Sequence, residues 1–499
     1  MRTDRSRTTG LAAAALIAAV TLGGCSAGDG WADSVGDVQP APQGYDEPYP
    51  ELYPELSRTA VRSGMTDPAQ DALSTFALDI DTGSYTRFRD SVTRGMSIDP
   101  REVRTEEFVN YFEQDYPTPE DGLGVSIDAT ALPFRPAHRL VRVGIASAPS
   151  SGVSRSDADL SLVVDCSGSM GEAGKMETTK AALRTLVASL RPSDRVAMVC
   201  YSTEAQVVLE PTPVSESAGI LAAVDRLAPQ ASTNAAAGLA LGYDVAMSMR
   251  TEGRMTRVVL ISDGVANVGE TDPDGILSRI STEAKTGINL ISVGVGITTY
   301  DDHLLEQLAD QGDGWHVYID TAAEAERVFA TGLTGSLVVA ARDAKAQVTF
   351  DPAQVSGYRL LGYENRAVAD EDFRNDAVDG GEVFAGHATT ALYEVALREG
   401  ASSEPFVTAT VRYLDDAGRP VERSGALAGP DCADSPREAS PRLRQDLVVA
   451  LLTDRLVGGP WSELISAADL RAESRTLPAV LDGDPDVAQL VDLVDRATT

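Results

Sequence analysis

The sequence predicts an α/β fold: a doubly wound, mainly parallel sheet with a small α+β region before it and a β-rich region with helices after it. Three observations favour this fold class. Apolar runs alternate with helical patterns between residues 158 and 338, as in strands joined by crossover helices. The flanking segments show strand patterns separated by Gly, Asp and Asn. Polar motifs follow several central apolar runs, at the sheet edge where such folds bind ligands.

The central region carries the clearest pattern. Residues 160–164 form a mostly apolar run, and residues 175–190 repeat Leu and Val at helical spacing. Further strands are predicted at residues 195–201, 206–209, 257–262, 289–295 and 315–319. Further helices are predicted at residues 218–227, 234–249, 274–285, 302–311 and 322–337.

The flanking regions also divide into strands and helices. Before the central region, strands are predicted at residues 73–80, 127–132 and 140–145, and helices at residues 85–93 and 100–112. After it, strands are predicted at residues 344–350, 359–363, 389–397 and 406–413, and helices at residues 442–456 and in parts of residues 469–497.

The N-terminal residues have the pattern of a secretory signal peptide. Three arginines precede an apolar stretch at residues 11–22, which is too short to span a bilayer as a mature helix. The sequence Leu-Gly-Gly-Cys that ends at Cys25 resembles a bacterial lipobox, in which the cysteine is lipidated, for example with palmitate. We therefore expect a lipid-anchored protein on the extracytoplasmic face of the cell membrane. An ordinary signal peptide with an incidental cysteine is the alternative.

These patterns predict five consecutive parts. Residues 1–25 are the lipoprotein signal peptide, and residues 26–70, rich in Gly, Pro, Asp and Tyr, are a flexible tether. Residues 71–157 form an N-terminal accessory domain, residues 158–338 the central domain, and residues 339–499 a C-terminal β-rich and helical domain.

The chain is strongly acidic. Its 42 Lys and Arg against 75 Asp and Glu give a formal net charge of −33. The first 25 residues contain three Arg and one Asp, so their removal would make the charge −35. Such a surface repels nucleic acid and anionic headgroups, which we therefore exclude as partners.

A metal-binding motif follows the first central strand. Asp165, Ser167 and Ser169 place a carboxylate and two hydroxyls at alternate positions of a tight strand-to-helix loop. Thr233 and Asp263 offer two further oxygens, each at the start of a loop or helix. Hard cations such as Mg²⁺ prefer oxygen ligands of this kind. A run of this type can also serve only as a loop or cap, and Thr233 is well placed as a helix N-cap, a role that Asn234 could share.

The pattern Asp-x-Ser-x-Ser, Thr and Asp resembles the metal-ion-dependent adhesion site (MIDAS) of von Willebrand factor type A domains. The chain also resembles the bacterial YfbK-like lipoproteins that contain such a domain. The stretches that carry this second resemblance are residues 74–82, 107–112, 138–144, 358–366 and 370–373.

The resemblance implies how the five oxygens would work. The hydroxyls of Ser167, Ser169 and Thr233 would coordinate a Mg²⁺ directly, with Mn²⁺ or Ca²⁺ as alternatives. Asp165 and Asp263 would act largely through water or hydrogen bonds. Because the direct ligands are neutral, the ion keeps most of its positive charge toward solvent. An Asp or Glu of a partner protein would then complete the coordination sphere.

The three cysteines after Cys25 cannot all pair within one chain. Cys166 and Cys200 each follow or end a predicted strand, and these strands are neighbours in the sheet of the resembled family. A disulfide between them is conceivable, and two buried thiols are the alternative. The family often has an aliphatic residue at the position of Cys166, which leaves the redox state near the site open.

These observations together predict a membrane-anchored protein-binding module that engages an unknown protein through a divalent cation. We expect no enzymatic activity and no small-molecule substrate. The four histidines lack the spacing of a zinc site, and neither a nucleophile elbow nor a phosphate-binding Gly-Lys-Ser/Thr loop is found. The alternative is a structural envelope scaffold in which the cation only stabilises the loops.

Overall fold

The structure is a computed structural model of the 499-residue chain, and its described residues lie within Tyr53–Thr499. The predicted signal peptide, Cys25 and most of the predicted tether lie outside the described residues. The structure describes residues 64–149, 156–172, 174–230, 232–264, 280–296, 302–312, 314–329, 338–363, 366–376, 378, 380–400, 402–415 and 417–498.

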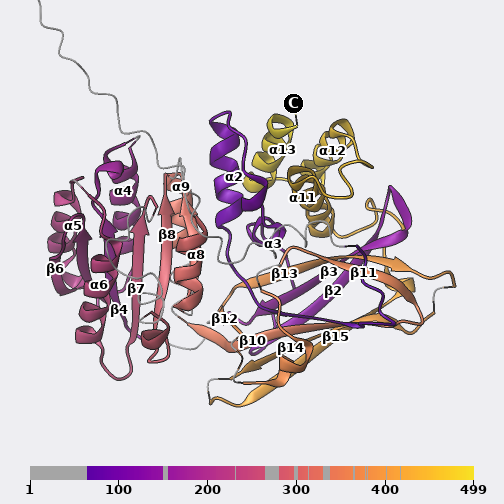
Figure 1. The fold of residues 1–499 in the computed structure, drawn as a ribbon, viewed down its shortest axis with the longest axis horizontal. Helices are drawn as coiled ribbons and strands as arrows, with labels where there is room; N and C mark the ends of the chain where they lie inside the picture. Colours follow the sequence, from indigo (N-terminus) through magenta and orange to yellow (C-terminus); the bar gives the residue numbers. More distant parts are fainter. Residues whose placement is uncertain are drawn as a thin grey trace, which may run out of the picture. The chain divides into compact units, whose positions relative to one another are not determined.

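The central domain contains a six-stranded sheet in the order β6-β5-β4-β7-β8-β9 (Figure 1). Strands β4, β5, β7, β8 and β9 run parallel, and β6 pairs antiparallel at one edge. The predicted doubly wound, mainly parallel sheet is therefore confirmed. Its strands are β4 (Ala158–Asp165), β5 (Arg195–Tyr201), β6 (Ala205–Pro213), β7 (Met255–Ser262), β8 (Ile288–Val295) and β9 (Trp315–Ile319).

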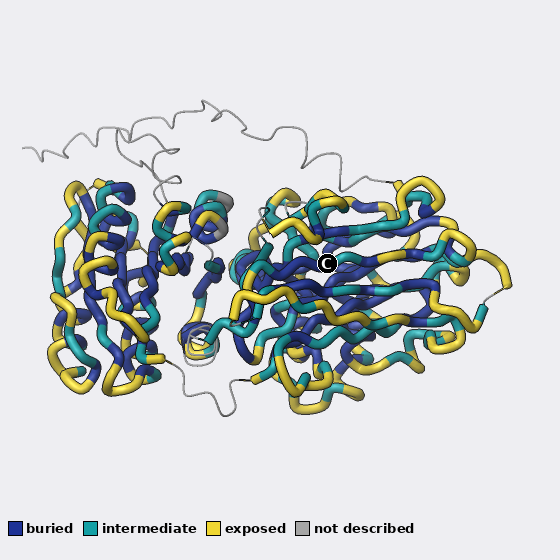
Figure 2. The backbone as a smooth tube through the Cα atoms, turned by 90° about the horizontal axis from the view of Figure 1, so that it is seen from below, coloured by how far each residue is buried: buried dark blue, intermediate teal, exposed yellow. Residues whose placement is uncertain are grey.

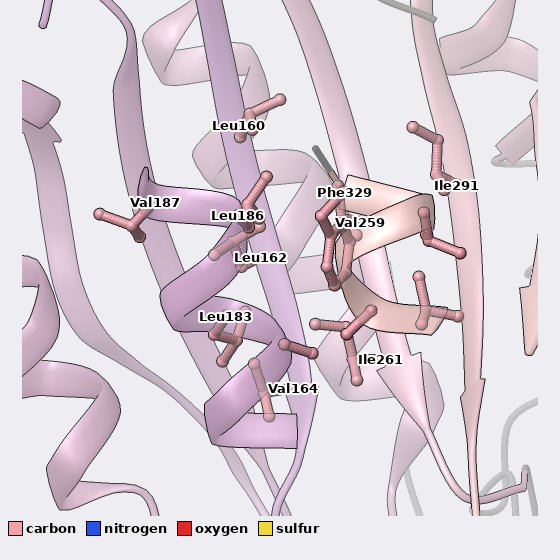
Figure 3. Close-up of a cluster of buried hydrophobic side chains, with 14 of the residues drawn as sticks. Leu160, Leu162, Val164, Leu183, Leu186, Val187, Val259, Ile261, Ile291 and Phe329 are labelled. Atoms are coloured by element: carbon pink, nitrogen blue, oxygen red, sulfur yellow. The ribbon is translucent and has the colours of Figure 1, made fainter. Parts of the chain in front are cut away.

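Helices cover both faces of this sheet. Alternate side chains of each strand point to opposite faces, so both faces carry apolar side chains that pack against helices. Leu162 and Val164 of β4 pack with Leu183 and Leu186 of α4 on one face (Figure 3), whereas Val163 packs with residues of α6 and α8 on the other. The helices of the first face are α4 (Lys175–Ser189), α5 (Ser217–Arg226) and α9 (Ala322–Glu326), and those of the second are α6 (Ala235–Met249) and α8 (Asp302–Gln311).

Two predicted central helices are described only in part. The helix predicted at residues 274–285 is described from residue 280, and residues 280–284 are helical. The helix predicted at residues 322–337 begins as α9 and continues as a π-turn at residues 327–329, beyond which the described residues resume at residue 338.

Strands from before and after the central domain combine in two further sheets that share one apolar core. Residues 71–157 and 339–499, predicted as separate domains, contribute strands to both sheets. One sheet has the order β1-β10-β14-β15, with β12 also paired to β10, and the other has the order β11-β13-β3-β2. The strands are β1 (Leu73–Ala77), β2 (Leu123–Leu132), β3 (Arg135–Ser147), β10 (Val339–Phe350), β11 (Val355–Leu361), β12 (Gly381–Phe384), β13 (Ala388–Leu397), β14 (Pro405–Leu414) and β15 (Pro420–Ala428).

The central domain is thus inserted into a β-sandwich, between β3 and β10. The two ends of the insertion are held by one turn after β12. Its Ala385 N–H donates to the carbonyl of Val338 (2.8 Å), and its Gly386 N–H donates to the carbonyl of Ala148 (3.2 Å). The chain therefore leaves the sandwich and returns to it at neighbouring points.

The remaining helices share a separate apolar core. They are α2 (Gly83–Thr93), α3 (Thr105–Asn110), α11 (Pro441–Val457), α12 (Ala467–Ser474) and α13 (Pro485–Ala497). The helix predicted at residues 100–112 is divided into the short 3₁₀ turn η1 and α3. The 3₁₀ turns are η1 (Pro100–Glu102), η2 (Gly168–Gly171), η3 (Val214–Glu216), η5 (Asp370–Arg374), η6 (Gly429–Asp431) and η7 (Leu477–Ala479).

Figure 2 shows buried residues along the interior strands of these sheets and exposed residues mainly at the loops. Within the described residues, no helix is both long enough and apolar enough to cross a bilayer.

Candidate functional site

The predicted metal motif lies at the carboxyl end of the central strand β4. This strand is buried along its whole length and ends at Asp165, after which the polar residues and glycine of the motif turn the chain into η2. The Ser167 N–H donates to Oδ1 of Asp165 (2.7 Å), a local bond that aspartate often makes in turns. This bond holds the loop against the end of the strand.

Three predicted side chains form a hydrogen-bonded row at this edge. The hydroxyls of Ser167 and Ser169 lie 2.9 Å apart. The Ser169 hydroxyl donates to Oδ1 of Asp263 (3.0 Å), which follows the neighbouring strand β7. The parallel pairing of β4 with β7 therefore brings two loops that are distant in sequence to one point.

Asp165 is fully buried beneath this row. Its Oδ2 accepts hydrogen bonds from the hydroxyls of Tyr201 (3.1 Å) and Ser262 (2.9 Å). Burial raises the pKa of Asp165, and the hydrogen bonds from Ser167 and Ser262 partly offset this effect. The negative charge of Asp263 also raises this pKa, so the two carboxylates repel each other across the site.

Tyr201 and Ser262 are site residues that the motif did not indicate. Burial raises the pKa of Tyr201 well above its ordinary value, so this phenol remains a proton donor. A signal for Tyr201 exists in the strand register, since Tyr201 is the partner of Asp165 across the β4–β5 pair. Ser262 directly precedes the predicted Asp263.

Thr233 lies in the segment that leads into α6, but the hydrogen-bonded row of described residues does not include it. Asn234, rather than Thr233, caps α6 by accepting from Ala237 N–H, so helix capping does not use the Thr233 hydroxyl. The segment is held near the loop at both ends. Gln230 N–H donates to the carbonyl of Cys166 (2.7 Å), and Asn234 N–H donates to that of Ser202 (2.7 Å).

A lysine that the sequence reasoning did not single out also enters the site. Lys175 begins α4, and its Nζ lies 2.8 Å from Oδ2 of Asp263. Asp263 therefore accepts from Ser169 through one oxygen and from Lys175 through the other.

Cys166 and Cys200 form a disulfide, with their Cα atoms 5.8 Å apart. Of the two alternatives for this pair, the structure contains the disulfide rather than two buried thiols. The bond joins the motif loop to the end of β5, beside Asp165 and Tyr201. Cys432 is free and half-buried, and burial raises the pKa of its thiol to about 11.

Three family models match consecutive parts of the chain. They are described as von Willebrand factor (residues 54–142), von Willebrand factor type A domain (residues 159–331) and YfbK, C-terminal (residues 335–428). The chain is also 35% identical over 341 residues to the YfbK protein of Escherichia coli, covering 66% of this chain and 59% of that protein. The chain belongs to the YfbK-like family of proteins with a von Willebrand factor type A domain.

Other relatives are more distant. The protein sll0103 of Synechocystis is 27% identical over 246 residues, which cover 47% of this chain and 57% of that protein. The alignments thus span less than two thirds of the length of either bacterial relative.

Two solved structures are similar in part. A von Willebrand factor type A protein from Catenulispora acidiphila is 16% identical with a TM-score of 0.45, covering 78% of this chain and 99% of its own. The ArnB paralog VWA2 from Sulfolobus acidocaldarius is 14% identical with a TM-score of 0.36, covering 75% of this chain and 97% of its own. Because both TM-scores are low, the fold assignment rests on the family model and the observed sheet topology.

The edge of the type A domain fits a hard cation by its chemistry. Hydroxyl and carboxylate oxygens converge there, and the buried Asp165 accepts only from neutral donors among the described residues. A site made of three or more His, Cys, Asp or Glu side chains is not found among the described residues. The direct ligands that the resemblance implies for a cation at this edge are the hydroxyls of Ser167, Ser169 and Thr233.

Proposed function

We propose that this YfbK-like protein is a binding module that uses a divalent cation at the carboxyl edge of β4 to engage an acidic residue of a partner protein. The observation that carries the proposal is the buried Asp165, which lies beside the row of Ser167, Ser169 and Asp263 and has only neutral donors among the described residues. The type A domain itself is a domain class associated with protein interaction.

The chemistry of the ligands explains why the partner would be acidic. Hydroxyl ligands leave the charge of a Mg²⁺ uncompensated, and the carboxylates of Asp165 and Asp263 would neutralise it only through hydrogen bonds or water. A carboxylate from outside then gains both a coordination position and a favourable charge. The proposed role is binding without a chemical step.

The proposed location is the extracytoplasmic side of the membrane. Its support is the signal-like sequence that ends at Cys25, where acyl chains would anchor the protein. A disulfide beside the motif supports the same location, because disulfides persist mainly in oxidising compartments.

The proposal is tested by affinity capture with the detergent-solubilised full chain on an envelope extract of the source organism. Capture is performed in Mg²⁺ and in EDTA, with the wild type and with the double variant Ser167→Ala/Ser169→Ala. We expect a partner that the wild type retains in Mg²⁺ and that is lost both in EDTA and with the double variant.

The matched control is Ser189→Ala, which removes a hydroxyl on α4 that donates to the carbonyl of Thr185 instead of to the site. This variant should retain the partner, and circular dichroism should show that all variants are folded. Identical retained proteins under every condition would contradict the proposal. If EDTA then lowered only the thermal stability, the cation would be structural, as in the scaffold alternative.

A further inference from the structure

The feature that carries a further inference is Lys175, a buried ammonium at the border of the candidate cation site. Its side chain is only 5% exposed. Nζ lies 2.8 Å from Oδ2 of Asp263 and 3.6 Å from Oε2 of Glu172. The Glu172 side chain is 68% exposed, so solvent screens that pair strongly. Asp263 is therefore the main counter-ion of Lys175.

The fold makes specific room for this lysine. Gly296, at the end of β8, has a φ of +61°, and a Cβ added there would lie 2.7 Å from Cγ of Lys175. The lysine stem therefore occupies space that any other residue at position 296 would fill. The first turn of α4 and Gly296 together position the lysine stem, and the ammonium lies beside Asp263.

The charges at this edge can be counted from these contacts. Asp165 and Asp263 supply two negative charges, and Lys175 supplies one positive charge. Without a divalent cation the group carries one unit of negative charge, and with a divalent cation it would carry one unit of positive charge. Without the lysine, the occupied site would be neutral.

We propose that Lys175 sets the charge of the cation site so that the bound cation requires an external carboxylate to complete it. The ammonium repels a divalent cation and therefore weakens its binding when no partner is present. The same ammonium adds to the positive charge that attracts an incoming carboxylate. Binding of the cation and of the acidic partner thereby become mutually reinforcing.

This inference rests on the proposed function, since it assigns Lys175 a role at the same site. Lys175 would act as a positioning and charge-setting residue rather than as a ligand, because its ammonium has no lone pair to offer. When no cation is bound, its pairing with Asp263 would also relieve the repulsion between Asp263 and Asp165.

The experiment measures the Kd for Mn²⁺ by isothermal titration calorimetry, with and without acetate as a carboxylate probe and with chloride at equal ionic strength as reference. For the wild type, we expect acetate to lower the Kd for Mn²⁺ several-fold. In Lys175→Met, which keeps the stem but removes the charge, we expect the Kd without acetate to fall about tenfold, because one fewer positive charge opposes the dication. The effect of acetate should be clearly reduced, because only the charge of the cation itself then attracts the carboxylate.

A second readout concerns the chain without a cation. In EDTA, Lys175→Met should lower the midpoint of thermal unfolding by roughly 2–4 °C, because Asp263 loses its counter-ion. A variant that binds Mn²⁺ more tightly but is less stable in EDTA is the expected signature. A merely structural lysine would lower stability without increasing the affinity for Mn²⁺.

Two control variants separate the effect of the charge of Lys175 from the effect of its position. Lys180→Met removes a lysine on the same helix that pairs with the exposed Glu177, and it should change neither the Kd nor the acetate effect. Lys175→Arg keeps the charge and should preserve the acetate effect. If Lys175→Met does not fold, Lys175→Gln takes its place.

The outcomes distinguish the two proposals. A wild type that shows no binding of Mn²⁺ overturns the proposed function together with this inference. A wild type that binds Mn²⁺ without any effect of acetate overturns the inference alone, and no variant is needed for that result. An unchanged Kd and acetate response in Lys175→Met would also overturn it.

Discussion

Strand β4 buries an aspartate near each end, and the two carboxylates are satisfied by different means. Near its start, Asp159 accepts from the guanidinium groups of Arg195 and Arg254 at 2.6–2.8 Å. At its end, Asp165 accepts from an amide and two hydroxyls. Both aspartates are fully buried, so burial alone does not show how the charge of each carboxylate is balanced.

The difference lies in whether the surrounding groups supply a positive charge. The arginines neutralise the charge of Asp159, so this carboxylate needs no further counter-ion. The donors around Asp165 satisfy its hydrogen bonds but not its charge, and a second carboxylate lies close by. A cation from outside would supply at this end what the arginines supply at the other.

The largest effect is expected from Asp159→Asn. This change should lower the free energy of unfolding by about 3 kcal/mol, because two partly buried guanidinium groups lose their charged partner. Urea unfolding in EDTA measures it. The control Asp225→Asn removes an exposed partner of Arg184 and should cost less than about 1 kcal/mol. Equal losses of unfolding free energy in the two variants would mean that the pairing of Asp159 with its two arginines does not stabilise the fold.

Asp446 is intermediate between these two aspartates, and the pH dependence of stability tests how its charge is balanced. It is fully buried and has one arginine, Arg142, at 3.4 Å and the amide of Gln114 at 3.1 Å. Burial raises the pKa of Asp446 to about 6, above the ordinary value of 3.8. The folded protein therefore holds this proton more tightly than the unfolded chain does.

The resulting stabilisation should be complete below about pH 4 and lost as pH rises through about 6. Relative to Asp446→Asn, the wild type should lose about 2.5 kcal/mol of unfolding free energy between pH 4 and pH 7, since one pKa unit corresponds to about 1.4 kcal/mol. Urea unfolding at several pH values measures this difference. Parallel pH curves for the two proteins would contradict the assignment.

The smallest effect on stability is expected from Asp165→Asn in EDTA. The free energy of unfolding should change by less than about 1 kcal/mol, because the hydroxyls of Tyr201 and Ser262 can turn to accept from an amide, which guanidinium groups cannot do. The Kd for Mn²⁺ should rise by at least about tenfold, as expected when a charged group is removed beside a dication. A large loss of stability in EDTA would show that Asp165 is as structural as Asp159.

The sequence predicted the central fold well because its signals are local. Strand and helix periodicity indicated the parallel sheet, and the motif placed Asp165, Ser167, Ser169 and Asp263 at one edge, where the structure joins them by hydrogen bonds. Asn234 rather than Thr233 caps α6. The local sequence does not decide between them, because both residue types favour the N-cap position.

Features that depend on distant residues were missed. Lys175 reaches Asp263 only because Gly296, far along the chain, leaves space for its stem. The sandwich pairs β1 with β10 and β3 with β13, and the inserted domain separates these partners in sequence. Alternation along a strand indicates which face is buried but not which strand lies beside it.

The paired ends of the inserted type A domain have a mechanical consequence. A pull on the domain would reach the sandwich through β3 and β10 together, so each connection would carry only part of the load. Both are inner strands, β3 between β13 and β2, and β10 between β1 and β14. Extracting either strand requires breaking two ladders of hydrogen bonds rather than one, so the sandwich resists a pull on the inserted domain.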